Sequence, residues 1–235
     1  MISLLAGCAI GFLGANSLNR SELERLRTEA AGAQKPTQTG ATGNAKLTDE
    51  EIQAGIHKAD ENSSDLVYQR NMGIALYRYA SSNKDTVLLA ESARLLKRVL
   101  ASDPQNTDIN IALGNTYFDI GYFNKDSASF AESRGYYETA LAKKPDDAAV
   151  RTDYGLTFFL QEPVDNDRAL MEFDKALRAD PKNEKALEFA TQIHVKRGDT
   201  EKARATLERL RIANPSNAAL AGLSALTQNS PEPRP

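Results

Sequence analysis

The chain has 235 residues, of which 41% are hydrophobic and 26% are charged. Its 29 Lys and Arg against 32 Asp and Glu give a formal net charge of -3, which offers no global electrostatic reason to bind nucleic acid. A single cysteine excludes an intramolecular disulfide framework, and with only two histidines beside it the chain cannot form a Cys/His zinc finger. The composition favours a helix-rich interaction protein and predicts neither a metal nor a cofactor.

Residues 1–19 form an apolar segment. Met1 to Ala15 carries no charged side chain, and a helix extended to Leu18 reaches ~27 Å, close to the ~30 Å hydrocarbon core of a bilayer. No basic residue precedes Leu4, as a cleaved secretory signal would require. We expect residues 1–19 to be a hydrophobic membrane-anchor helix.

The single cysteine lies inside this segment and allows an alternative. Leu5-Ala6-Gly7-Cys8 resembles the lipobox of bacterial lipoproteins, in which the cysteine is lipidated. Only seven residues precede Cys8, where a full hydrophobic region is needed. Lipidation of Cys8 is therefore the less favoured reading.

Residues 20–46 predict a stalk followed by a flexible linker. Leu23, Leu26 and Ala30 form a short helical stripe, and Ala31 to Ala45 is rich in Gly, Thr, Gln, Ala and Pro without apolar periodicity. Thr48 and Glu51 then match a capping box, which predicts the start of a leading helix within residues 47–65.

Prolines punctuate the rest of the chain. Pro104, Pro145, Pro181 and Pro215 follow one another at intervals of 41, 36 and 34 residues, and each ends an amphipathic helix. Each proline is followed ten residues later by a small residue. The stretch between successive prolines forms one unit of two predicted helices, and the second helix of each unit carries a small residue followed four positions later by a large apolar one. The first set is Gly114, Gly155, Thr191 and Ala225, with Gly73 in the same place in the first unit; the second set is Ser92/Leu96, Ser133/Tyr137, Ala169/Phe173 and Ala203/Leu207. Small residues let paired helices approach, and the large residues fill the gap.

This pattern resembles the tetratricopeptide repeat (TPR) family, whose unit is two antiparallel helices with L-G-x-x-Y, A-x-x-x-F and P signatures. The resemblance implies an all-α fold, an α-α superhelix (TPR-like solenoid) with four repeats over residues 66–217. A C-terminal capping helix is expected at 218–227 and a disordered tail at 228–235. The last unit departs from the pattern, because Thr191 and His194 replace Gly and Tyr.

The first two units are longer and alike. A shift of 41 residues superposes Asn83-Lys84-Asp85 on Asn124-Lys125-Asp126, which indicates an internal duplication. The third unit carries extra residues near Pro163, where we expect the turn between its two helices.

The titratable residues form no catalytic constellation. His194 stands where the other units have Tyr117 and Phe158, so a packed ring is favoured over a catalytic base. Asp146-Asp147 lies at a predicted helix start, where carboxylates stabilise the helix dipole. No phosphate-binding loop or nucleophile elbow occurs. We expect a protein that is not an enzyme.

The resemblance implies that a peptide or protein partner lies along the concave face, which the first helix of each unit lines. The spacing of Gly73, Gly114 and Gly155 assigns the following residues to that face: Arg70, Ile74, Tyr77, Ile111, Asn115, Phe118, Asp119, Thr152, Leu156, Phe159, Lys185, Glu188 and Gln192. A carboxylate clamp of Lys, Arg and Asn is not expected, since only Asn115 suits one.

The aromatic residues of this face allow two readings. Tyr77, Phe118 and Phe159 recur at intervals of 41 residues and would form an aromatic ladder in an apolar groove that anchors the partner. Alternatively, the rings pack between neighbouring units and hold the superhelix together.

The sequence therefore predicts a TPR scaffold that binds a protein or peptide and is anchored by a single pass in a bacterial cell membrane. The side of the membrane stays open: Arg20, Arg25 and Arg27 favour a cytoplasmic body, whereas envelope relatives often face the periplasm. The alternative function is a self-associating structural platform, a homo-oligomer built by stacking of solenoid ends.

Overall fold

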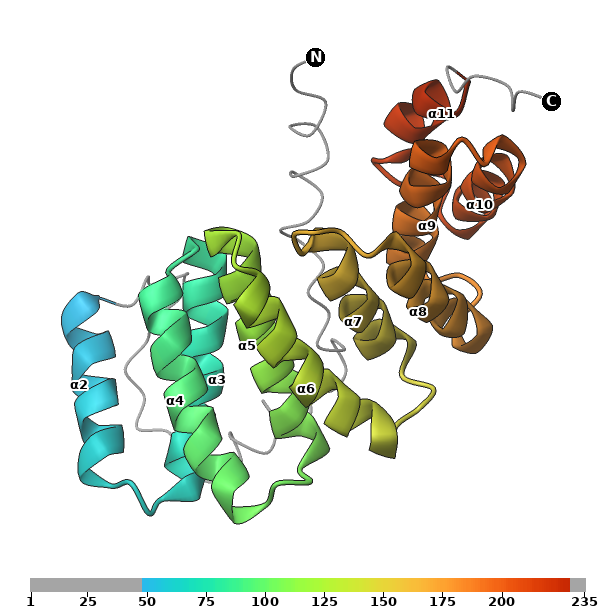
Figure 1. The fold of residues 1–235 in the computed structure, drawn as a ribbon. Coiled ribbons are helices and arrows are strands. Elements are labelled where there is room, and N and C mark those ends of the chain that lie inside the picture. Colours follow the sequence, from blue (N-terminus) through green and yellow to red (C-terminus); the bar gives the residue numbers. More distant parts are fainter. Residues whose placement is uncertain (1–47, 229–235) are drawn as a thin grey trace. The chain divides into compact units, whose positions relative to one another are not determined.

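The computed structural model describes residues 48–228, and these residues form ten α-helices (Figure 1). In chain order they are α2 (Asp49–Glu61), α3 (Leu66–Asn83), α4 (Thr86–Ser102), α5 (Thr107–Asn124), α6 (Ser127–Lys143), α7 (Ala148–Leu160), α8 (Asn166–Ala179), α9 (Glu184–Arg197), α10 (Thr200–Ala213) and α11 (Leu220–Gln228). The predicted anchor helix, stalk and linker lie outside the described residues, as does the predicted tail from residue 229. Helix α11 includes Gln228, one residue beyond its predicted end.

The chain divides into two compact units, residues 1–58 and residues 59–235. In the first unit the predicted capping box is confirmed. The Thr48 amide donates to Glu51 Oε2 at 2.8 Å, and the Glu51 amide donates to Thr48 Oγ1 at 3.2 Å. This reciprocal pair satisfies amide groups that have no partner within the helix at the start of α2.

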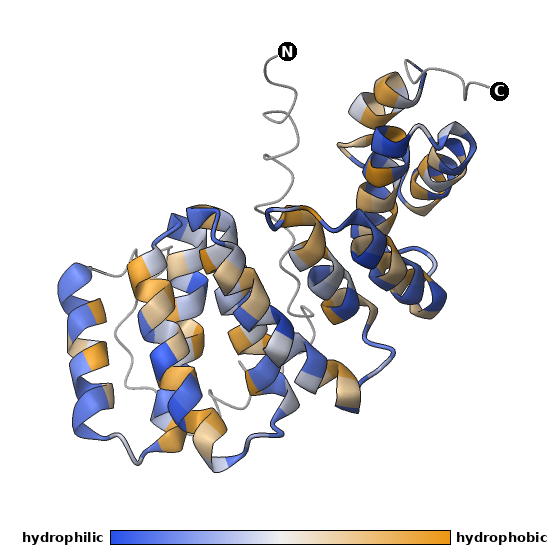
Figure 2. Ribbon diagram, viewed as in Figure 1, coloured by the Kyte–Doolittle hydropathy of each residue, from blue (hydrophilic) through white to orange (hydrophobic). Residues whose placement is uncertain are grey.

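In the second unit, consecutive helices pack as antiparallel pairs: α3 with α4, α5 with α6, α7 with α8, and α9 with α10. Neighbouring pairs are joined by contacts of α4 with α5, α6 with α7, and α8 with α9, and α11 packs on α9 and α10. Pro104, Pro145 and Pro181 lie in the turns between pairs, and Pro215 lies in the turn after the last pair. Helices α3 to α10 each carry both hydrophobic and hydrophilic residues (Figure 2), as expected for helices that bury one side.

Within the first three pairs, a glycine backbone contacts a large side chain. A Cβ atom added at Gly114 would overlap the Tyr137 ring, one at Gly155 would lie 2.8 Å from Phe173 Cε1, and Gly73 faces Leu96 in the same way. These are the small-and-large positions that the repeat pattern predicts. The two helices of a pair can approach this closely only because glycine has no side chain.

Serine hydroxyls reinforce the same contacts. Ser92 Oγ donates to the Gly73 carbonyl at 2.7 Å, and Ser133 Oγ donates to the Gly114 carbonyl at 2.8 Å. Both serines are fully buried. Each hydrogen bond links the second helix of a pair to the backbone of the first helix beside the glycine.

In the last pair, a threonine replaces glycine at the position where the two helices approach. Thr191 is fully buried in the position that glycine has in the earlier pairs. Its hydroxyl donates to the Leu187 carbonyl at 2.7 Å and lies 2.8 Å from the Thr206 hydroxyl of α10. The departure from the repeat pattern is therefore accommodated by a buried, hydrogen-bonded side chain.

The suspected duplication has a matching turn in both copies. Lys84 and Lys125 adopt the left-handed conformation, with φ of 57° and 55°. The following residues, Asp85 and Asp126, cap α4 and α6, since each carboxylate accepts hydrogen bonds from two backbone amides of the next turn. The same three-residue sequence thus ends one helix and begins the next in both of the duplicated repeats.

The extra residues of the third unit lie between α7 and α8, as predicted. Glu162 in this turn donates from its amide to Ser127 Oγ at 2.9 Å, and the Ser127 hydroxyl donates to the Glu162 carbonyl at 3.2 Å. The turn is therefore tied to the first residue of α6 in the preceding pair.

We predict that Gly114→Ala lowers the free energy of unfolding by about 1–3 kcal/mol, because the new methyl group overlaps the Tyr137 ring. Gly135→Ala is the matched control, since Gly135 also lies within a helix but has no atom within 4 Å of an added Cβ. That change should stabilise the protein by about 0.5–1 kcal/mol. Urea unfolding measures both values. A free energy of unfolding for Gly114→Ala equal to or above that of the wild type would contradict the proposed close contact.

Candidate functional site

The first helices of the pairs are linked to one another. Ser81 Oγ of α3 donates to Asp119 Oδ2 of α5 at 2.6 Å, and helices α5 and α7 are in contact. Between α7 and α9, Lys185 Nζ donates to Asp153 Oδ1 at 3.0 Å. We call the surface formed by α3, α5, α7 and α9 the first-helix face. It carries every residue that the sequence assigned to partner binding.

The middle of this face is buried. Phe118 is 2% exposed and its ring meets Phe130 of α6 edge-on, with 5.6 Å between ring centroids. Phe159 is 8% exposed and meets Phe189 of α9 in the same manner at 5.2 Å. The other buried residues of the predicted set are Tyr77, Ile111, Asn115, Asp119, Thr152 and Leu156. The Phe159–Phe189 contact joins neighbouring pairs, as the second reading of the aromatic series predicts, whereas the Phe118–Phe130 contact lies within one pair.

The accessible residues of the predicted set lie on α3 and α9. Arg70, Ile74, Lys185, Glu188 and Gln192 are all half-buried and keep part of their surface in contact with solvent. Gln192 Nε2 donates to Glu188 Oε1 at 3.4 Å, and burial raises the pKa of the Glu188 carboxyl. These residues carry positive, negative, amide and apolar groups, whereas the aromatic side chains expected to line an apolar groove are buried.

Asp119 is a titratable group in the interior of the first-helix face. It is 5% exposed, and burial raises the pKa of its carboxyl to about 6. Hydrogen bonds from Ser81 and Tyr77 oppose this shift, while the nearby charge of Asp153 adds to it. Asp119 was predicted to contact a partner, but its carboxylate is occupied by residues of α3.

Two further polar residues of the face also have partners within the chain. Asn115 Oδ1 accepts a hydrogen bond from the Tyr137 hydroxyl at 2.7 Å, and burial raises the pKa of that phenol well above its usual value. Thr152 Oγ1 donates to the Ala148 carbonyl one turn earlier at 2.7 Å. Asn115, the one residue that suits a carboxylate clamp, is therefore engaged in joining α5 to α6.

A buried ion pair between α7 and α9 was not anticipated from the sequence. Asp153 is 7% exposed, and burial raises the pKa of its carboxyl although the Lys185 ammonium opposes the shift. The two residues are 32 positions apart, so no local pattern connects them. Their contact depends on the packing of one repeat against the next.

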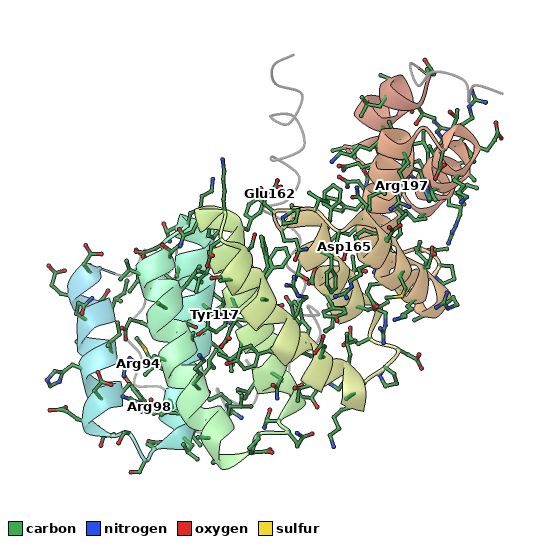
Figure 3. The ribbon with its side chains drawn as sticks, viewed as in Figure 1. Arg94, Arg98, Tyr117, Glu162, Asp165 and Arg197 are labelled. Atoms are coloured by element: carbon green, nitrogen blue, oxygen red, sulfur yellow. The ribbon has the colours of Figure 1, made fainter. Side chains whose placement is uncertain are left out.

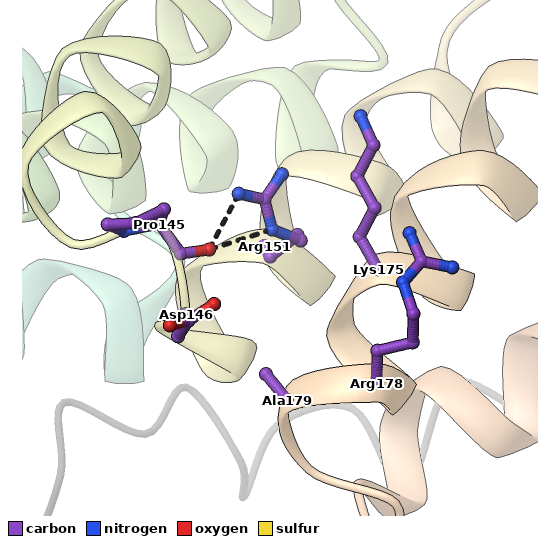
Figure 4. Close-up of a pocket in the computed structure, with 6 residues that line it drawn as sticks. All are labelled: Pro145, Asp146, Arg151, Lys175, Arg178 and Ala179. Atoms are coloured by element: carbon purple, nitrogen blue, oxygen red, sulfur yellow. Dashed lines mark hydrogen bonds between the residues drawn. The ribbon is translucent and has the colours of Figure 1, made fainter.

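A second candidate site lies on the third pair. A cavity of about 490 Å³ is lined by Pro145 and Asp146 of the turn before α7, by Arg151 of α7, and by Lys175, Arg178 and Ala179 of α8 (Figure 4). Sequence reasoning missed it. The available signal was the spacing of Lys175 and Arg178, which places both on one side of α8.

Other charged groups hold elements together. Arg94 and Arg98, one turn apart on α4 (Figure 3), both pair with Asp60, at 2.6 and 2.8 Å. Their hydrogen bonds lower the pKa of the Asp60 carboxyl.

His194 is half-buried, as the repeat pattern predicts; burial lowers its pKa, and its Nδ1 lies 3.5 Å from Asp199 Oδ2.

Residues 48–228 contain neither a metal-binding cluster nor a membrane-spanning helix. No three His, Cys, Asp or Glu side chains in this part of the chain are grouped so that they could hold a metal ion. None of its helices combines the length and the apolar character needed to cross a membrane.

These observations define the described part of the chain as an all-α helical repeat built from antiparallel helix pairs. Comparison with known families agrees: tetratricopeptide repeat profiles match residues 126–184 and residues 164–226. The two profiles together cover residues 126–226, so this part of the chain resembles tetratricopeptide repeats. No curated protein sequence matches it significantly.

Solved structures share the fold. MamA superposes with a TM-score of 0.54 at 14% identity, covering 71% of this chain and 88% of its own. The C-terminal part of a TPR repeat-containing protein from Cytophaga hutchinsonii gives a TM-score of 0.57 at 16% identity, with 74% and 65% covered. A thermophilic TPR protein of Thermus thermophilus gives 0.53 at 15% identity, with 77% and 90% covered.

We predict that Asp119 makes the protein less stable as the pH rises from about 4 to about 6. The pKa of this carboxyl is higher in the folded chain, about 6, than its ordinary value of 3.8, so the folded state binds more protons in that window. The contribution of this carboxyl to the free energy of unfolding is complete below pH 4 and decreases as the pH rises to about 6. At higher pH it does not change further.

Asp119→Asn removes this titration and keeps an oxygen that can accept the Ser81 hydrogen bond. The stability of the variant relative to the wild type should therefore improve between pH 4 and pH 6.5, as measured by urea unfolding across that range. A difference that does not change with pH would contradict the raised pKa.

Proposed function

We propose that this protein is a non-enzymatic scaffold that binds an extended protein or peptide segment along the first-helix face. The observation that carries the proposal is the linked, side-by-side arrangement of α3, α5, α7 and α9, which supports one continuous surface. The rings of Phe118 and Phe159 are packed in the interior of this surface. A surface held in place by such packing loses little conformational entropy when a partner binds.

The accessible residues indicate how a partner is held. Arg70 and Ile74 lie at one end of the face on α3, and Lys185, Glu188 and Gln192 lie at the other on α9. A segment that follows the face can thus form polar contacts at both ends.

The test is cross-linking in cells from photoreactive residues placed at Arg70 and at Gln192, with Val87 as the control. Val87 is 73% exposed but lies on α4, away from the first-helix face. Both face positions should capture the same partner, and the Val87 position should not. Equal capture from Val87 would argue against the proposed surface.

With the captured partner in hand, Arg70→Ala and Gln192→Ala should each weaken binding about 3- to 10-fold, the usual effect of truncating a contributing interface residue. Val87→Ala should leave affinity unchanged. Circular dichroism is measured in parallel, because loss of helix content would mean that a variant acts through folding.

We further propose that residues 1–19 anchor the scaffold in a bacterial cell membrane and that residues 20–46 link it to the repeats. The support is the uncharged apolar segment followed by a sequence typical of linkers. The full-length protein should stay in the membrane pellet at high salt, and deletion of residues 1–19 should release it. Cys8→Ser should remain in the pellet; its release would instead favour lipidation. Release of the full-length protein by salt would contradict the anchor.

Self-association is the second candidate function. Ile212 on α10 and Leu226 on α11 are 69% and 36% exposed, so the last helices carry apolar surface that another copy could cover. Molar mass measured by light scattering over a range of concentrations separates the candidates, since a strict monomer counts against a structural platform.

A further inference from the structure

The cavity on the third pair is built around one fixed guanidinium. Arg151 donates from Nε and from one terminal nitrogen to the Pro145 carbonyl, at 3.3 and 2.7 Å, and from the other terminal nitrogen to Glu172 Oε2 at 2.8 Å. Figure 4 shows the two bonds to Pro145. An arginine side chain has five N–H groups, so two of them remain for a ligand.

Glu172 fixes a second cation of the site. This carboxylate is only 3% exposed and also accepts from Lys175 Nζ at 2.6 Å. Arg151 and Lys175 therefore share one buried acid, which holds both side chains in place before any ligand arrives. Such preorganisation reduces the entropy that a ligand must overcome on binding.

Arg178 supplies the third cation. It is exposed on α8, lines the cavity with Lys175, and forms no ion pair with any described residue. Asp146 is the one acidic residue in the lining. With Glu172 included, three cations face two carboxylates, and the site keeps one unbalanced positive charge.

We propose that this cavity binds the carboxylate side chain of an acidic peptide segment. A planar carboxylate matches the fork of a guanidinium and supplies the single negative charge that balances the site. A doubly charged phosphate would leave the site with one net negative charge. The cavity lies between α8, the turn before α7 and the first turn of α7, where Arg151 is directed toward Glu172 of α8, and its lining includes none of the residues assigned to partner binding on the first-helix face.

Fluorescence anisotropy of a tryptophan-bearing peptide tests the proposal, because the protein itself contains no Trp. The probe is acetyl-Trp-Gly-Glu-Glu-Gly-amide, whose blocked ends leave side-chain carboxylates as its only charges, and the matched peptide replaces both Glu with Gln. The full-length protein should bind the acidic peptide at least 10-fold more tightly, with affinity falling as salt is added. Equal affinity for the two peptides would overturn the proposal.

Protein variants locate the site. Arg178→Gln should weaken binding of the acidic peptide about 3- to 10-fold, whereas Arg209→Gln, an exposed arginine of α10, should have no effect. Equal losses in the two variants would show nonspecific attraction and refute the site. Loss of binding in Arg70→Ala would place the peptide on the first-helix face and also refute it.

Competition distinguishes the two anion classes. Acetate should displace the acidic peptide at least as well as inorganic phosphate at equal concentration and pH. Stronger displacement by phosphate would overturn the assignment to carboxylate. Because the variants of the first-helix face are measured separately, failure of this site leaves the proposed scaffold function standing.

Discussion

The contact between a glycine backbone and a large side chain is the constraint on which the repeat depends. A solenoid has no single central core, so each pair of helices must be closed by its own contacts. At Gly73, Gly114 and Gly155 the facing side chains lie so close that even a methyl group would overlap them or force them to move. The buried serine bonds at Ser92 and Ser133 fix the same approach. Once the two helices of a pair are in contact, their relative position fixes which side chains face outward, and these side chains can pack on the next pair.

Polar groups also join the first helices of neighbouring pairs. Ser81 bonds to Asp119, and Asp153 pairs with Lys185, in surroundings where burial penalises the charged carboxylates. Removing such groups from water is costly, and their hydrogen bonds offset the cost only in one arrangement. The same contacts that align the repeats therefore place titratable groups inside the first-helix face.

This arrangement separates two tasks on the molecule. Aromatic residues such as Phe118 and Phe159 make the framework rigid and are withdrawn from solvent. In the functions that we propose, recognition falls to half-buried side chains at the two ends of the face and to the fixed cations around Arg151. A rigid framework that displays a few accessible polar groups is suited to binding an extended segment, because little of the surface has to be ordered on binding.

The sequence alone determined the helical repeat, the pairing of helices and several of their local contacts. Proline positions, the small-and-large spacing at Gly114 and Tyr137, and the capping residues Thr48 and Glu51 act within one turn or one pair, so their patterns are visible along the chain. Helical spacing also placed the predicted partner-binding residues on the first helix of each pair. It could not decide which of those residues are accessible, because exposure depends on the neighbouring repeat.

Only the tertiary structure decided the site chemistry. Phe159 is covered by Phe189, and Asp153 meets Lys185, through contacts between repeats that no local period encodes. The cavity at Arg151 likewise needs Glu172 and Arg178 from another helix to fix and supply its charges. Periodicity records which side of a helix is buried, whereas distances between charges on different helices are set by how the pairs pack.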